Sequence, residues 1–263
     1  MNKSIFLLLT LAILSCKQNN SEESKDVPEQ EQQATTTSNP FVDNIASAHN
    51  KAAFAAQEAV AFDLQLMFGG NERINATISM LTNSSKIRID KTDGTQLTYD
   101  GSQVYSAPKG AIPDGARFDI FTWPYFFAFP FKLQDPGVNI QELTNDTEGQ
   151  FKLTFEGGTG DTPDDWYIGY LDEENRVEAT AYIVTFGDKT IENAEAAPHA
   201  IAYSDYKEIE QVPLATTWKF YNWSEEKGVF GDPIGEAQLR NIRFFEVDDG
   251  FFVVRVDEIV DKK

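Results

Sequence analysis

Few side chains in this sequence could carry out covalent chemistry. Its 263 residues include one cysteine, Cys16, and two histidines, His49 and His199. A thiol can act as a nucleophile, and an imidazole can transfer protons near neutral pH. The three residues are far apart in the sequence, which contains no Gly-x-Ser-x-Gly elbow, no His-Glu-x-x-His pair and no phosphate-binding loop. The sequence therefore predicts no catalytic residues.

Carboxylates are plentiful, and a dense group of them lies in residues 157–167, GGTGDTPDDWY. Asp161, Asp164 and Asp165 could offer oxygen ligands to calcium. The spacing does not match an EF-hand loop and no closing glutamate follows, so an acidic turn capped by Asp161 or Thr162 is the favoured interpretation. No metal or cofactor is predicted, and a carboxylate-dependent hydrolase is only a third possibility for the function.

Cys16 ends a short apolar segment at the start of the chain. Lys3 supplies a positive charge, residues 5–14 are mostly apolar but too few to span a bilayer, and Ile13, Leu14 and Ser15 precede the thiol. This arrangement resembles the lipobox of bacterial lipoproteins, in which the signal is cut before a cysteine that carries a diacylglycerol. The resemblance implies a signal peptide at residues 1–15 and lipidation of Cys16. An ordinary secretory signal with an incidental cysteine is the alternative.

The residues after Cys16 are polar and acidic up to Asn39, so they cannot fold alone and predict a flexible tether at residues 16–39. Residues 40–263 then form a single predicted domain. Lys17, which is not the aspartate that retains many lipoproteins in the inner membrane, favours the outer membrane. Acyl chains on Cys16 are the predicted membrane attachment, since no later apolar run is long enough for a transmembrane helix.

The net charge of −20 excludes one broad class of partners. A strongly acidic surface repels nucleic acid and anionic lipid headgroups. The sequence therefore predicts no nucleic-acid binding. Because Cys16 is the only thiol, no intramolecular disulfide can staple the mature domain, and its fold must rest on an apolar core.

The elements that must form this core are predicted from hydrophobic periodicity. Asn39, Pro40 and apolar residues at helical spacing predict an N-terminal helix that continues through an alanine-rich stretch to Ala59. Alternating residues in 60–68 and 74–80, joined by a turn at 69–71, predict a β-hairpin. Further strands are predicted at 86–90, 96–99, 104–105, 151–155, 166–170, 177–186, 200–206, 216–221, 238–245 and 251–256. The fold class is therefore mainly β (α+β), with a strongly curved antiparallel sheet forming an incomplete barrel.

Residues 118–131, FDIFTWPYFFAFPF, have an unusual composition. Pro124 and Pro130 exclude a central strand, so a loop or broken helix is expected. A segment this apolar must be buried or must face a ligand, partner or membrane. It is either a plug that closes the open side of the sheet or a lid over an apolar cavity. The predicted cavity residues are Phe62, Leu64, Leu66, Ile78, Ile89, Trp123, Phe126 and Phe127. A further cluster, Trp218, Phe220, Tyr221 and Trp223, is assigned to core packing.

Two resemblances bear on function. Residues 85–89 followed by 97–105, SKIRI and LTYDGSQVY, resemble a hairpin of LolA/LolB-type lipoprotein carriers, which implies an incomplete barrel with helices as a lid. Residues 116–123, 158–167 and 218–224 resemble a family of uncharacterised Bacteroidota lipoproteins. This resemblance supports the predicted fold and location, and because the family has no established activity, it supplies no catalytic residues to carry over. LolA itself is soluble, so the predicted lipid anchor brings this chain closer to LolB.

Together these features predict a lipid-anchored envelope protein that binds a lipid, acyl chain or lipoprotein tail in a half-barrel cavity. A structural module that docks on an envelope partner is the alternative. The lipid anchor can be tested directly with globomycin, which blocks lipoprotein signal processing. The treated precursor should remain uncut and migrate more slowly on a gel than the mature protein. Normal cutting in the presence of globomycin would exclude the lipoprotein assignment.

Overall fold

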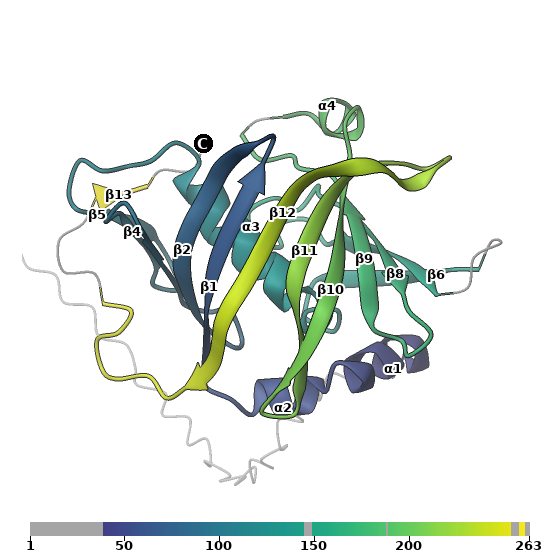
Figure 1. Cartoon of the computed structure of the whole chain (residues 1–263), viewed down its shortest axis with the longest axis horizontal. Coiled ribbons are helices and arrows are strands. Elements are labelled where there is room, and N and C mark those ends of the chain that lie inside the picture. Colours follow the sequence, from purple (N-terminus) through teal and green to yellow (C-terminus); the bar gives the residue numbers. More distant parts are fainter. Residues whose placement is uncertain (1–38, 145–148, 188, 254–257, 261–263) are drawn as a thin grey trace, which may run out of the picture. The chain divides into compact units, whose positions relative to one another are not determined.

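An antiparallel sheet that curves around one helix forms most of the structure, a computed structural model (Figure 1). The structure describes residues 39–144, 149–187, 189–253 and 258–260. The predicted signal peptide, Cys16 and the tether up to residue 38 lie outside the described residues. The chain separates by its internal contacts into Met1–Thr37 and Ser38–Lys263, and every described residue belongs to the second unit.

The described residues form a 13-stranded sheet with the order β13-β5-β4-β3-β2-β1-β12-β11-β10-β9-β8-β7-β6. Its ends, β13 and β6, are not paired with each other, so the sheet is not closed into a barrel, as predicted. The strands are β1 (Ala59–Phe68), β2 (Asn71–Leu81), β3 (Ile87–Lys91), β4 (Gln96–Tyr99), β5 (Val104–Ala107), β6 (Val138–Leu143), β7 (Gln150–Phe155), β8 (Tyr167–Leu171), β9 (Val177–Tyr182), β10 (His199–Ile209), β11 (Val212–Ser224), β12 (Gly228–Phe245) and β13 (Glu258–Ile259). The helices are α1 (Pro40–Ala48), α2 (Lys51–Ala55), α3 (Ala116–Ala128), the 3-10 turn η1 (Phe129–Phe131) and α4 (Ile191–Glu195).

The predicted hairpin of β1 and β2 is confirmed, with its turn at Gly69 and Gly70. Its side chains alternate because successive residues of a strand point to opposite faces. Phe62 pairs with Ile78, which pairs with Ile89 on β3, and all three are fully buried. The apolar face of these strands therefore forms a continuous row across the sheet.

Helix α3 covers this apolar face, inside the curve of the sheet (Figure 1). It is the broken helix expected from the aromatic segment: Pro124 lies within it, and η1 follows directly. Phe127 stacks on Phe62 with ring centroids 4.3 Å apart, and Phe131 stacks on Phe54 at 3.9 Å. A sheet with one apolar face needs such a cover, since exposed apolar area costs about 25 cal/mol per Å².

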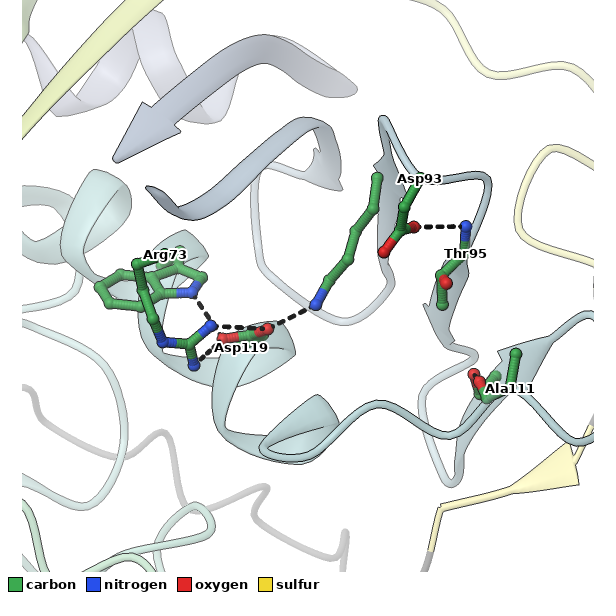
Figure 2. Close-up of polar contacts among 8 residues, drawn as sticks. Arg73, Asp93, Thr95, Ala111 and Asp119 are labelled. Atoms are coloured by element: carbon green, nitrogen blue, oxygen red, sulfur yellow. Dashed lines mark hydrogen bonds and ion pairs between the residues drawn. The ribbon is translucent and has the colours of Figure 1, made fainter. Parts of the chain in front are cut away.

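A buried carboxylate fixes α3 to the strands beneath it. Asp119 is fully buried, and its oxygens lie 2.7 Å from the guanidinium of Arg73 on β2 and 2.7 Å from the ammonium of Lys91 on β3. The indole of Trp123 donates a third hydrogen bond at 2.9 Å. Figure 2 shows Arg73 and Asp119 facing each other across this contact. A buried charge is tolerated only when it is paired and hydrogen-bonded, and Asp119 meets both conditions.

The N-terminal helix differs from the prediction because it is interrupted at Asn50. Asn50 adopts a left-handed conformation, with φ of 47°, and its side chain donates to the carbonyl of Gln211 at the tip of the β10–β11 hairpin. The break turns His49 inward, where its Nε2 accepts the amide hydrogen of Val177 at 2.9 Å. The helix then ends at Ala55 instead of Ala59, and Ala59 already belongs to β1.

Several strand boundaries also differ from the prediction. The strand expected at 177–186 ends at Tyr182, because the amide of Thr185 donates to the Asp165 side chain and not to a neighbouring strand. Phe251 and Val253 form turns where a strand is expected at 251–256, and residues 254–256 of that range lie outside the described residues. Strand β6 is not predicted at all, although Val138 and Ile140 alternate with polar residues after a Pro-Gly turn.

The Asp119 anchor predicts a large effect of Asp119→Asn on stability. The amide retains the size of the side chain but leaves Arg73 and Lys91 without a neutralising charge, which should lower the free energy of unfolding by about 3 kcal/mol. Denaturant unfolding would measure the change. Asp114→Asn, an exposed change of the same charge just before α3, is the control and should shift it by less than about 0.5 kcal/mol. Equal effects of the two variants would contradict the anchor.

His49 predicts a loss of stability in mild acid. Burial lowers the pKa of its imidazole from 6.5 to about 4. The unfolded chain therefore takes up a proton that the folded protein excludes between these pH values, and stability falls as the pH drops through that window. The titration of His49 should lower the free energy of unfolding by about 3 kcal/mol at pH 4, relative to neutral pH. His49→Gln keeps an acceptor for Val177 but cannot titrate, so its denaturant-unfolding stability should fall less between pH 7 and pH 4. An unchanged pH dependence would show that His49 is not the responsible group.

Candidate functional site

A cleft of about 510 Å³ lies on the side of α3 that faces away from the row of Phe62, Ile78 and Ile89. Helix α3 forms its floor. Residues of β3 and β4 line one side, and residues of β7, β8 and β9 line the other. We call these two groups of strands, β3–β4 and β7–β9, the wings of the sheet. The wings approach each other across α3, and the cleft is the space left between them.

Helical spacing places two sets of α3 side chains on opposite faces of the helix, one in the core and one at the cleft. Ile120, Trp123 and Phe127 recur at three and four residues and are buried in the core. Phe118, Phe121 and Tyr125 recur in the same way along the opposite face and line the cleft.

Aromatic contacts join α3 to both wings of the sheet. The Phe121 ring contacts Tyr99 of β4 with centroids 5.1 Å apart, and Phe126 contacts Tyr182 of β9 at 4.9 Å. Tyr125 contacts Tyr167 of β8 at 5.6 Å. All of these rings line the cleft, so its wall is a set of packed aromatic side chains. Such walls are typical of sites that bind apolar ligands.

Two ion pairs lie at the cleft. The guanidinium of Arg117 contacts both carboxylate oxygens of Asp161, at 2.7 and 2.6 Å, and lies 5.0 Å from the centroid of the Phe121 ring. The ammonium of Lys132 lies 2.7 Å from Asp135. Bidentate pairing fixes the planar guanidinium in place. The Arg117 pair therefore ties the loop after β7 to the start of α3 and shapes the wall.

A third carboxylate at the cleft, Asp165, has no cation paired with it among the described residues. Its Oδ1 accepts from the amide and hydroxyl of Thr185, both at 2.7 Å, and its Oδ2 accepts from the hydroxyl of Thr162 at 2.7 Å. Burial raises the pKa of this carboxyl, against the opposing effect of the three hydrogen bonds. The amide of Asp165 donates to the carbonyl of Thr162, so the expected acidic turn is present, with Asp164 exposed. The expected cap is not observed, because the Asp161 side chain is bound to Arg117 and the Thr162 hydroxyl donates to Asp165.

The predicted cavity residues divide between the core and the cleft. Of the eight, Phe126 lines the large cleft. Phe126 and Phe127 also line a second cavity of about 20 Å³, beside His49 and Trp218, which is close to the volume of a single water. The other six, Phe62, Leu64, Leu66, Ile78, Ile89 and Trp123, are buried in the core. The cavity differs in position from the prediction because α3 fills the space directly above β1, β2 and β3.

The cleft residues that sequence reasoning does not single out are Tyr125 and Arg117. Tyr125 belongs to the aromatic segment, and its three- and four-residue spacing from Phe118 and Phe121 is a signal for a shared helical face. Arg117 carries no such signal, because its partner Asp161 is 44 residues away. Trp218 and Phe220 are buried in the core, as predicted.

The histidines occupy structural positions. His49 is bound to the backbone of Val177, and His199 begins β10, as expected for a residue after Pro198. Burial lowers the pKa of His199, with the charge of Lys189 acting in the same direction. Within the described ranges, no three His, Cys, Asp or Glu side chains are grouped so that they could hold a metal ion. No helix in the same ranges has the length and hydropathy needed to cross a bilayer.

Comparison with known proteins supports the fold. No family model matches the sequence, and a search of curated proteins finds no match. Among solved structures, a LolA superfamily protein from Nitrosomonas europaea matches with a TM-score of 0.51 and 10% identity, over 80% of this chain and 97% of that one.

Two further structures are more distant. A DUF1329 family protein from Desulfovibrio piger gives a TM-score of 0.42 and 9% identity over 82% and 98% of the two chains. The lipoprotein LppX from Mycobacterium tuberculosis gives 0.27 and 11% over 84% and 100%. At these values only the first likeness carries weight, and it shows that the described domain has a LolA-like fold.

Proposed function

We propose that this protein binds the apolar part of a lipid, acyl chain or other amphiphile in the cleft beside α3, without catalysis. The observation that carries the proposal is the cleft itself, an open space of about 510 Å³ with aromatic walls beside the buried core. Its volume lies within the range of about 300–1,000 Å³ that is usual for small-molecule sites. The LolA-like fold supports the proposal at the level of architecture.

The driving force would be burial of apolar surface. Each Å² of ligand removed from water contributes about 25 cal/mol, from which the ordering of ligand and side chains must be subtracted. The rings that line the cleft are already packed against one another, so few of them would lose freedom on binding. A wall organised in this way lowers the entropic cost of binding.

We further propose that the protein acts at the outer membrane, attached through acyl chains on Cys16. The acidic tether that follows Cys16 would allow the domain to move relative to the lipid surface while it stays close to the membrane. Two or more acyl chains are needed for stable attachment, which is the number that lipoprotein processing provides. The alternative is a structural module that docks on an envelope partner.

Native mass spectrometry after expression without lipid would test the proposal. The chain from Ser38 onward contains every described residue, and a cooperative melting transition would verify its folding. We expect a discrete lipid adduct, or uptake of an added monoacylglycerol. An empty protein that takes up no lipid, neutral or charged, would contradict the proposed function and favour the docking module.

Filling the cleft should abolish uptake. Val184 is half-buried and lines the cleft, so Val184→Trp would place an indole in the space that a ligand needs. Ile191→Trp, on exposed α4 outside the cleft, is the matched control. We expect at least a tenfold weaker affinity for the first variant and no change for the second, as measured by calorimetric titration. Unchanged binding by Val184→Trp, with its melting temperature preserved, would place the ligand elsewhere.

A further inference from the structure

The polar groups around the cleft are mostly satisfied by one another. Arg117 is bound to Asp161 and Lys132 to Asp135, so both cations that line the cleft are neutralised. An anionic headgroup would have to break one of these pairs to find a cation. Tyr125 and Asp165 retain hydrogen-bonding capacity, and the hydroxyl of Ser84, which also lines the cleft, is likewise buried without a hydrogen-bond partner among the described residues.

Tyr125 is the first of these. It lines the cleft, yet its hydroxyl is buried and has no hydrogen-bond partner among the described residues. The neighbouring rings of Phe129, Phe155 and Tyr167 surround it with apolar surface, at centroid distances of 6.0, 6.2 and 5.6 Å. An unsatisfied buried hydroxyl is destabilising, so a ligand atom that accepts its hydrogen would recover this energy.

Asp165 is the second. A carboxylate offers about four acceptor positions, and three of those on Asp165 are used by Thr162 and Thr185. One acceptor position therefore remains, on a side chain that carries an uncompensated charge at the cleft. The two groups also lie within electrostatic reach of each other: burial is the largest cause of the raised pKa of Tyr125, and the charges of Asp135 and Asp165 add to it.

From these two groups we infer that the cleft prefers an amphiphile whose polar head is uncharged and both donates and accepts hydrogen bonds, such as a hydroxyl or an amide. This inference rests on the proposed function. The head would accept a hydrogen bond from Tyr125 and donate one to Asp165. A hydroxyl and an amide each contain a donor and an acceptor, so either head carries both of the groups that these two cleft residues can use.

Charged heads satisfy only part of this arrangement. A carboxylate or phosphate has acceptors for Tyr125 but is repelled by Asp165, and burial strengthens this repulsion. An ammonium group could pair with Asp165 but offers Tyr125 no acceptor. The cleft should therefore rank a monoacylglycerol above the ammonium and the carboxylate of the same chain length.

Calorimetric titration of the chain from Ser38 with monolaurin, dodecylamine and laurate, each below its aggregation concentration at neutral pH, would test this ranking. We expect monolaurin to bind about tenfold more tightly than laurate, which corresponds to one hydrogen bond that involves a charged group. Tyr125→Phe should weaken monolaurin binding and leave dodecylamine binding nearly unchanged, because an ammonium offers Tyr125 no acceptor. Asp165→Asn removes the charge and should improve laurate binding. The preference for monolaurin over laurate should then fall to less than about threefold.

Two matched controls separate these effects from general changes in charge or aromatic content. Tyr221→Phe removes a hydroxyl outside the cleft, and Asp248→Asn removes an exposed charge outside it. Both should leave the preference unchanged. If Asp165→Asn fails to fold, the Tyr125→Phe variant alone decides the test, since removal of an unpartnered hydroxyl should not impair folding.

The outcomes distinguish this inference from the proposed function. Equal affinity for the three probes, or tighter binding of laurate, would overturn the preference for a neutral head while lipid binding stands. The assignment of these residues would also be overturned if monolaurin kept its full preference over dodecylamine in Tyr125→Phe and over laurate in Asp165→Asn. Failure of all three probes to bind would contradict the proposed function itself.

Discussion

The structure depends on a single constraint: an open sheet with one apolar face must find a cover from the same chain. Helix α3 provides this cover, and its position is fixed by Asp119, whose two cationic partners come from β2 and β3. Aromatic stacking alone is poorly directional, because many ring arrangements have similar energies. The buried ion pairs add a requirement that only one placement of the helix meets. Gly115, with φ of 72°, lets the chain turn sharply into α3 just before this contact.

The cleft follows from the same constraint. A helix has a diameter of about 10–12 Å with its side chains, so it can fill the centre of a curved sheet but cannot also fill the space between the two wings. The inner face of α3 packs against β1, and its outer face lines the cleft. Helix α3 is therefore the expected plug on its inner face and the floor of the cleft on its outer face. Phe127 packs in the core as part of the plug, and Phe121 and Tyr125 line the cleft.

Local patterns were sufficient to predict the curved antiparallel sheet and the β1–β2 hairpin, because alternation along a strand reports burial directly. They could not place the cavity. Phe62 and Ile78 have the composition expected of cavity walls, but whether such residues face a void or another side chain depends on α3, which is 35 or more residues away in the sequence. The pairing of Arg117 with Asp161 is hidden for the same reason. The break at Asn50 is a tertiary effect too, since its side chain is bound to the β10–β11 hairpin.

The polar groups of the cleft show how stability and selectivity can share one site. Arg117 and Lys132 are each neutralised by a carboxylate, so the folded protein leaves no net positive charge there, which fits a chain of net charge −20. Tyr125 and Asp165 remain incompletely satisfied, at a cost that the packed aromatic wall can bear. A fold optimised for stability alone would replace Tyr125 with phenylalanine, which fits the same space without a buried hydroxyl. The presence of the hydroxyl, along a cleft that is also lined by the carboxylate of Asp165, is most simply explained by a ligand that completes its hydrogen bonding.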